Sequence, residues 1–174
     1  MGLFGKSKRE LLEWQNIIAP NTPKLMWNEA QLRIFTERSV TESLKTIQES
    51  MNLCNTTKRP AVFFKRYDII LYQMDVLARL EKFVRFDGDQ PGEKLIELKN
   101  CKYSEIDKMI DRSWKDTLEK INTLKTKKAK INKVISFRAE LDGYSEFMNN
   151  KNIDKYEKIC NDFLEEYANS SKTE

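Results

Sequence analysis

The sequence contains no histidine among its 174 residues. Histidine is the commonest general base and the commonest metal ligand in proteins. Its absence removes every Ser-His or Cys-His nucleophile pair, and it removes the Glu-x-x-His motif of di-iron helix bundles. No glycine-rich phosphate-binding loop of standard spacing occurs either. We therefore predict that the protein is not an enzyme and carries no metal or other cofactor.

Cysteine, glycine and proline are also scarce. Cys54, Cys101 and Cys160 lie far apart and form no C-x-x-C pair, which argues against a disulfide framework and against a zinc site. Five glycines and four prolines leave few places for hairpins and many uninterrupted helical windows. We expect an all-α fold.

Long apolar runs are missing as well. No segment approaches the roughly 18 apolar residues that a membrane span needs, and the N-terminus lacks the apolar stretch of a secretory signal. We expect a cytoplasmic protein with no membrane partner. The alternative is a weak peripheral contact in which Leu3, Phe4, Leu11 and Trp14 insert into lipid.

Helical periodicity is what the sequence has instead, and it is strongest at residues 60–84. Pro60 suits the first turn of a helix, and neither Gly nor Pro follows before Val84. Apolar residues cover more than half of the projected circumference, so we expect neighbours on at least two sides and a central place in the fold. One ridge holds Phe63, Tyr67, Ile70, Met74, Leu77 and Val84, and the other holds Val62, Ile69, Val76, Leu80 and Phe83.

Around this central helix we expect a single-domain bundle of five to seven helices over residues 1–174, with frayed ends at about 1–7 and 168–174. A first helix is predicted at 7–18, a loop at 86–92 and a last helix at 153–167. Residues 25–54 form either one helix or two, since Ser39 with Glu42 offers a capping box for a second helix.

Residues 93–148 carry two apolar sets that are rotated relative to each other around an ideal helix. A continuous helix of this length would measure about 84 Å, whereas a compact chain of this size has a radius of gyration of about 16 Å. We therefore favour a break near Thr126. A long rod that pairs as a coiled-coil homodimer is the alternative.

Three groups of residues are candidates for function. The segment from Lys120 to Ala139 has seven Lys or Arg and no Asp or Glu, a density that attracts phosphates or an acidic protein surface, although a solvated turn explains it as well. Its candidate contacts with an anion or a nucleic acid are Lys125, Lys127, Lys128, Lys130 and Lys133. A net charge of +4 is too small to diagnose a nucleic-acid binder.

The other two groups lie in the central helix. Arg66, Gln73 and Glu81 project into its apolar arc, where Arg66 either receives an anionic ligand in a cleft or pairs with Glu42 or Glu97 to fix helix register. Phe64 and Tyr72 project to its polar side, and exposed aromatic residues often contact partner proteins. Burial beneath the N-terminal helix is the alternative for these two aromatic side chains.

Two stretches, VFFKRYDIILYQMDVLARLEKF and WKDTLEKINTLKTKKAKIN, carry a resemblance to a known group. With them the chain resembles small helical proteins of unassigned activity from Gram-positive bacteria and their phages. The resemblance implies a bacterial or phage setting and no activity.

We expect a protein-interaction module, such as a phage- or mobile-element-borne modulator of a host protein. An auxiliary nucleic-acid-binding protein that uses residues 120–138 is the first alternative. A ligand-binding or hydrolytic protein with a cleft at Arg66 is the second.

Overall fold

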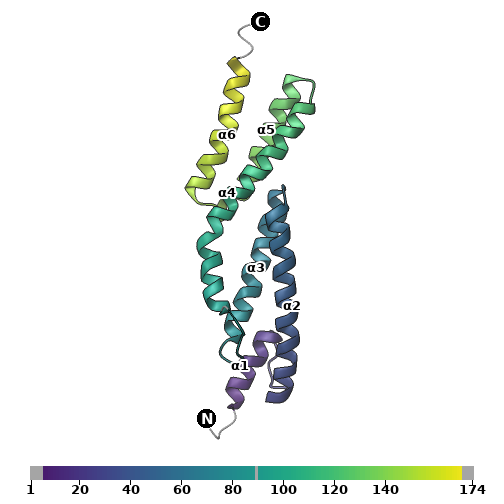
Figure 1. Cartoon of the computed structure of the whole chain (residues 1–174), viewed down its shortest axis with the longest axis vertical. Coiled ribbons are helices and arrows are strands. Elements are labelled where there is room, and N and C mark those ends of the chain that lie inside the picture. Colours follow the sequence, from purple (N-terminus) through teal and green to yellow (C-terminus); the bar gives the residue numbers. More distant parts are fainter. Residues whose placement is uncertain (1–5, 89, 170–174) are drawn as a thin grey trace. The chain divides into compact units, whose positions relative to one another are not determined.

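The computed structural model describes residues 6–88 and 90–169. Within them the chain forms six α-helices and one short 3₁₀-helix, and no strand (Figure 1). The predicted all-α fold is confirmed. The helices are α1 (Lys8–Ile18), α2 (Glu29–Thr56), α3 (Pro60–Leu80), α4 (Pro91–Thr123), α5 (Lys127–Asp142) and α6 (Asn150–Asn169), with the 3₁₀-helix η1 (Ser145–Phe147) between the last two.

The residues group into two compact units. Unit 1 comprises Met1–Asn52 and Arg66–Asn100, and unit 2 comprises Leu53–Lys65 and Cys101–Glu174. The division falls inside α2, α3 and α4, so each of these helices contributes residues to both units.

The core of unit 1 is built on Trp14, which is completely buried. Its indole ring stacks on Phe83 with the ring centroids 5.3 Å apart, and its Nε1 donates a hydrogen bond of 2.8 Å to Thr36 Oγ1. The polar N–H group of this buried indole therefore has a hydrogen-bond partner. The remaining buried apolar residues of this cluster are Ile17, Leu32, Val76 and Leu80.

The core of unit 2 joins the C-terminal part of α4 to α5 and α6, which run beside it (Figure 1). Trp114 of α4 contacts Phe137 of α5 and Phe163 of α6, with ring centroids 5.2 and 5.9 Å away. Between α4 and α6, Lys155 Nζ lies 3.0 Å from Asp107 Oδ2 and 2.8 Å from Asp111 Oδ1.

The helix predicted at residues 60–84 is present and largely buried, but it ends at Leu80. Tyr67, Ile70, Met74 and Leu77 are each less than a tenth exposed. Residues 81–83 form a turn in place of the predicted last helical turn. The turn brings the Glu81 carboxylate to the N-terminus of α4, where Oε1 accepts a hydrogen bond of 2.6 Å from the Gly92 N–H.

The helix boundaries decide between the alternatives for residues 25–54 and 93–148. Residues 29–56 form one helix, capped by Asn28 and Gln31, whose side chains each accept a hydrogen bond from the other's backbone N–H. The capping box at Ser39 and Glu42 is therefore absent, because both residues lie in the middle of α2. The predicted break near Thr126 is confirmed: α4 ends at Thr123, and Thr126 Oγ1 caps α5 by accepting from the Ala129 N–H.

The expected first and last helices are also present, as α1 and α6. Ser7 is the N-cap of α1 and forms a capping box with Glu10, and Ala168 and Asn169 belong to α6, so these residues are not frayed. The rest of the expectation of frayed ends concerns residues 1–5 and 170–174, which lie outside the described residues, as do Leu3 and Phe4.

Candidate functional site

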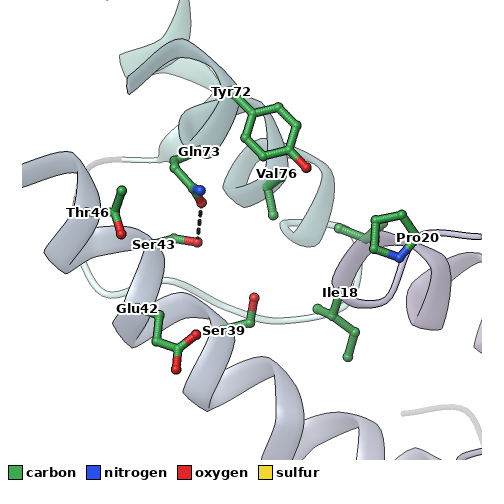
Figure 2. Close-up of a pocket in the computed structure, with 10 residues that line it drawn as sticks. Ile18, Pro20, Ser39, Glu42, Ser43, Thr46, Tyr72, Gln73 and Val76 are labelled. Atoms are coloured by element: carbon green, nitrogen blue, oxygen red, sulfur yellow. Dashed lines mark hydrogen bonds between the residues drawn. The ribbon is translucent and has the colours of Figure 1, made fainter. Parts of the chain in front are cut away.

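A polar pocket of about 220 Å³ lies between α2 and α3 in unit 1, closed at one side by the end of α1 and the segment that follows it (Figure 2). We call it the α2–α3 pocket. Its lining residues are Ile17, Ile18, Pro20, Ser39, Glu42, Ser43, Thr46, Tyr72, Gln73 and Val76.

The α2 side of the pocket follows from helical spacing. Ser39, Glu42, Ser43 and Thr46 stand at positions i, i+3, i+4 and i+7, so they share one face of the helix. Among the described residues, the Ser39 and Thr46 hydroxyls make no hydrogen bond, and Glu42 makes no ion pair. These three side chains therefore present acceptor oxygens that have no partner in the described part of the chain.

The α3 side carries Tyr72, Gln73 and Val76. Ser43 is buried, and its Oγ donates a hydrogen bond of 2.7 Å to Gln73 Oε1, drawn as the dashed line in Figure 2. This bond fixes which end of the Gln73 amide faces α2 and leaves the amide nitrogen for another acceptor. Tyr72 is 56% exposed.

The third side is held in place by Gln15 of α1. This residue is completely buried, yet its side chain is fully engaged with the backbone of the α1–α2 segment. Its Nε2 donates to the Lys24 carbonyl, and its Oε1 accepts from the Met26 and Trp27 N–H groups. The segment that presents Pro20 to the pocket is thus fastened to α1 by three hydrogen bonds.

Two of the five candidate residues in the helix predicted at 60–84 line this pocket and three do not. Tyr72 and Gln73 both line it, and the expected exposure of Tyr72 is confirmed. The expected exposure of Phe64 is wrong, since it is only 4% exposed. Its ring stacks on Tyr144 and contacts Phe147, residues about 80 positions along the chain that a helical projection cannot take into account.

Arg66 and Glu81 have different environments. Arg66 is half-buried and does not line the α2–α3 pocket. Among the described residues it pairs with neither Glu42 nor Glu97, and Glu97 instead pairs with Lys94 at 2.6 Å. Glu81 is a capping residue for α4, as described above, so its polar character inside the apolar arc has a structural explanation.

The basic segment is less free than its sequence suggests. Lys120 pairs with Asp116, and Arg138 pairs with Glu157 at 3.1 Å, so acids from elsewhere neutralise part of it. Lys130 lies over the Tyr167 ring at 5.8 Å. Lys125, Lys127 and Lys128 are exposed around the N-terminus of α5, whereas Lys133 is half-buried.

Lys58, in the connection between α2 and α3, is also paired with acids. Lys58 Nζ lies 3.1 Å from Asp116 Oδ1 and 3.5 Å from Glu119 Oε2. The hydrogen bond with Asp116, and then the negative charge of Glu119, raise the pKa of Lys58 above its ordinary value.

Sequence reasoning missed the hydroxyl residues of α2. Thr36, Ser43 and Ser50 recur every seven residues and are all buried, which places them on one face of the helix. This spacing was a readable signal, because small polar residues at heptad positions indicate a polar packing face. Leu44, on the same helix, is 51% exposed.

In residues 6–88 and 90–169 no group of three or more Cys, Asp or Glu side chains is placed to hold a metal ion. None of the described helices is both long and apolar enough to cross a membrane. No protein-family model, no curated protein and no solved structure shows a significant match to the chain.

Proposed function

We propose that the protein is a non-enzymatic, helical protein-interaction module whose partner docks at the α2–α3 pocket. The observation that carries this proposal is the set of acceptor side chains around the pocket, Ser39, Glu42 and Thr46, which have no partner among the described residues beside an exposed Tyr72. Tyrosine is enriched among the residues that dominate binding energy at protein interfaces.

The size of the pocket supports a protein partner over a small-molecule substrate. Pockets for drug-sized ligands and cofactors usually measure about 300–1,000 Å³, whereas this one measures about 220 Å³. A volume of this order suits one side chain of a larger partner. The absence of histidine from the sequence also removes the commonest catalytic base.

The proposal also includes a cellular setting and a class of partner. The resemblance to small helical proteins of Gram-positive bacteria and their phages supports a cytoplasmic bacterial host protein as the partner, with this chain as its modulator. A homodimer would be a competing occupant of the same surface.

The test is capture of a partner from a Gram-positive bacterial lysate on the immobilised protein, followed by identification and rebinding with the purified partner. Tyr72→Ala should weaken rebinding by about tenfold or more, the effect of losing an interface hot spot. The matched control is Tyr103→Ala, which removes another exposed tyrosine.

Equal affinity of wild type and Tyr72→Ala for every rebound partner would contradict docking at this pocket. Sedimentation of the protein alone tests the competing occupant. If the protein forms a dimer and Tyr72→Ala abolishes it, the occupant of the pocket is a second copy of the chain and not a host protein.

A second candidate function is nucleic-acid binding through Lys125, Lys127 and Lys128. The observation that favours it is their exposure around the first turn of α5, which contains no acidic residue. Lysines here stand at the positive end of the helix dipole, where an anion such as a phosphate group is favoured.

Charge reversal separates this candidate from protein binding. If it is correct, affinity for a DNA duplex should fall steeply with salt, and the triple change of these lysines to glutamate should abolish binding. Lys45→Glu is the control, because Lys45 is an exposed lysine of α2 outside the segment. Affinity that is unaffected by the triple change would reject the candidate.

A further inference from the structure

A second pocket of unit 1, of about 510 Å³, is lined by α2 and by the turn that follows α3. We call it the Arg85 pocket. Within the described chain its lining holds three basic side chains and one acidic one, which gives a net charge of +2. The lining residues are Arg33, Glu81, Lys82, Phe83, Val84 and Arg85.

The acidic residue of the lining is already engaged. Glu81 Oε1 accepts a hydrogen bond of 2.6 Å from the Gly92 N–H at the start of α4, so its negative charge faces the positive end of the α4 dipole, which offsets part of it. A further cation lies beside the pocket, since Lys6 Nζ is 5.9 Å from the centroid of the Phe83 ring. An anion in the pocket therefore gains Coulomb energy.

The turn that carries Arg85 is anchored by its apolar residues. Phe83 and Val84 pack against the buried core of unit 1. Their N–H groups donate to the Leu80 carbonyl, at 2.9 and 3.0 Å. Lys82 and Arg85, on either side of these two residues, are exposed. The backbone that presents the two charges is thus held in place before a ligand binds, which lowers the ordering cost of binding.

Arg85 differs from the other two bases in its pairing. Arg33 pairs with Glu29 at 2.8 Å, and Lys82 pairs with Glu13 at 3.3 Å. Among the described residues the Arg85 guanidinium makes no ion pair and no hydrogen bond, which leaves its five N–H donors for a ligand. A guanidinium presents these donors in a planar fork that matches the oxygens of a phosphate group.

We propose that the Arg85 pocket binds a phosphate monoester of a small organic molecule, with the phosphate on the Arg85 guanidinium and with Arg33 and Lys82 supplying positive potential. This inference is independent of the protein-binding function proposed above. A phosphate monoester carries a charge of about −1.5 to −2 at pH 7, which the net charge of the lining matches. The pocket volume lies in the range of about 300–1,000 Å³ that is usual for small-molecule sites, and the half-buried Phe83 and Val84 offer apolar surface to the organic part.

The experiment is an NMR titration of the full-length protein, followed through the backbone amides of residues 82–85. It is carried out at about pH 7.5, where a phosphate monoester is almost fully dianionic. The probe is phenyl phosphate, and phenyl sulfate is the comparison, because it has the same shape and a single negative charge. We expect saturable binding of phenyl phosphate and about fivefold weaker binding of phenyl sulfate, the effect of one charge at a solvent-accessible site.

The pH dependence of binding gives a second readout, because it should come from the ligand. The chain has no histidine, the side chain that ordinarily titrates between about pH 5 and 8, so the bases of the pocket keep their charge in this interval. The second pKa of a phosphate monoester is about 6. Affinity for phenyl phosphate should therefore fall toward that of phenyl sulfate at about pH 5, whereas affinity for phenyl sulfate should stay constant.

Two substitutions test the assignment of the bases. Arg85→Gln should weaken phenyl phosphate binding by about fivefold, and Arg33→Gln, which acts through the potential alone, by about twofold. Circular dichroism checks that both variants fold. The matched control is Arg38→Gln, which removes an exposed arginine of α2 outside the pocket and should bind phenyl phosphate like the wild type.

The inference is overturned if phenyl sulfate binds as tightly as phenyl phosphate at about pH 7.5, if Arg85→Gln leaves the affinity unchanged, or if no saturable shift appears. Binding of vesicles that contain phosphatidic acid, without binding of phenyl phosphate, would also overturn it, because the phosphate would then belong to a lipid surface.

Discussion

Buried polar side chains in unit 1 hold its helices in register. Trp14 and Thr36 join α1 to α2, Gln15 fastens the segment after α1, and Ser43 with Gln73 joins α2 to α3. A buried polar group that loses its partner costs more than the hydrogen bond itself contributes, because it has already given up water. Residues of this kind therefore specify one packing arrangement over others.

The Trp14–Thr36 hydrogen bond gives the first prediction. Trp14→Phe should lower the free energy of unfolding by about 2–3 kcal/mol, since it leaves the Thr36 hydroxyl unpaired and opens a cavity. In the Thr36→Val background the same change should cost about 1 kcal/mol less, because the unpaired hydroxyl is gone. Urea unfolding of the four proteins measures the coupling, and additive effects would show that the bond contributes nothing.

The second prediction concerns Asp116, whose carboxylate forms ion pairs with Lys120 and Lys58. The hydrogen bond from Lys120 first, and the one from Lys58 after it, lower the pKa of the Asp116 carboxyl below its ordinary 3.8, against the opposing effect of burial. A carboxyl with a lowered folded-state pKa stabilises the fold above its unfolded pKa and loses that stabilisation as the pH falls through the folded value.

Asp116→Asn should therefore cost about 1 kcal/mol at neutral pH, and the difference from wild type should shrink as the pH falls below 3.8. Urea unfolding at a series of pH values measures it. Asp162→Asn, which removes an exposed carboxylate without an ion pair among the described residues, is the control. A difference that stays constant down to strongly acidic pH would contradict the assignment.

Capping side chains determine where several helices of this chain begin. Ser7 with Glu10 starts α1, Asn28 with Gln31 starts α2, and Thr126 starts α5. The start of α4 is different, because its cap comes from Glu81, in the turn after α3. A carboxylate at a helix N-terminus both accepts an orphan N–H and faces the positive end of the dipole.

The third prediction tests the cap that Glu81 provides at the N-terminus of α4. Glu81→Ala should lower the free energy of unfolding by about 1–2 kcal/mol. Gly92 lies so close that an added Cβ would stand 3.2 Å from Glu81 Oε2, so Gly92→Ala should gain little in the wild type. In the Glu81→Ala background the contact is gone, and Gly92→Ala should stabilise α4 by about 0.5–1 kcal/mol. Equal effects of Gly92→Ala in both backgrounds, measured by urea unfolding, would contradict the contact.

The sequence predicted elements better than it predicted their ends and neighbours. Apolar periodicity was sufficient for α1, α3 and α6 and for the break near Thr126, because these signals are local. The end of α3 at Leu80 was missed, since it depends on contacts of Phe83 with Trp14 and of Glu81 with Gly92. The α2 side of the pocket was missed because Ser39 and Glu42 were interpreted as a helix cap.

At the scale of the whole molecule, a single domain was predicted, and the chain divides into two compact units. The division does not follow a linker. It passes through α2, α3 and α4, and each unit is assembled from two separate stretches of sequence. Composition could not indicate such a boundary, because neither proline nor glycine is concentrated at residues 52–53, 65–66 or 100–101.

The shared helices lead to the fourth prediction, that the two units unfold together. Loss of either unit removes turns from α2, α3 and α4, and a shortened helix is less stable because helix formation is cooperative.

Tryptophan fluorescence can report on each unit separately. Trp114→Phe leaves Trp14 and Trp27 in unit 1, and the double change of those two to Phe leaves Trp114 in unit 2. In each variant, urea unfolding followed by fluorescence should coincide with unfolding followed by circular dichroism, the signature of a two-state transition. Transitions that separate in either variant would show that the units are independent folding domains, and the single-domain prediction would then be wrong.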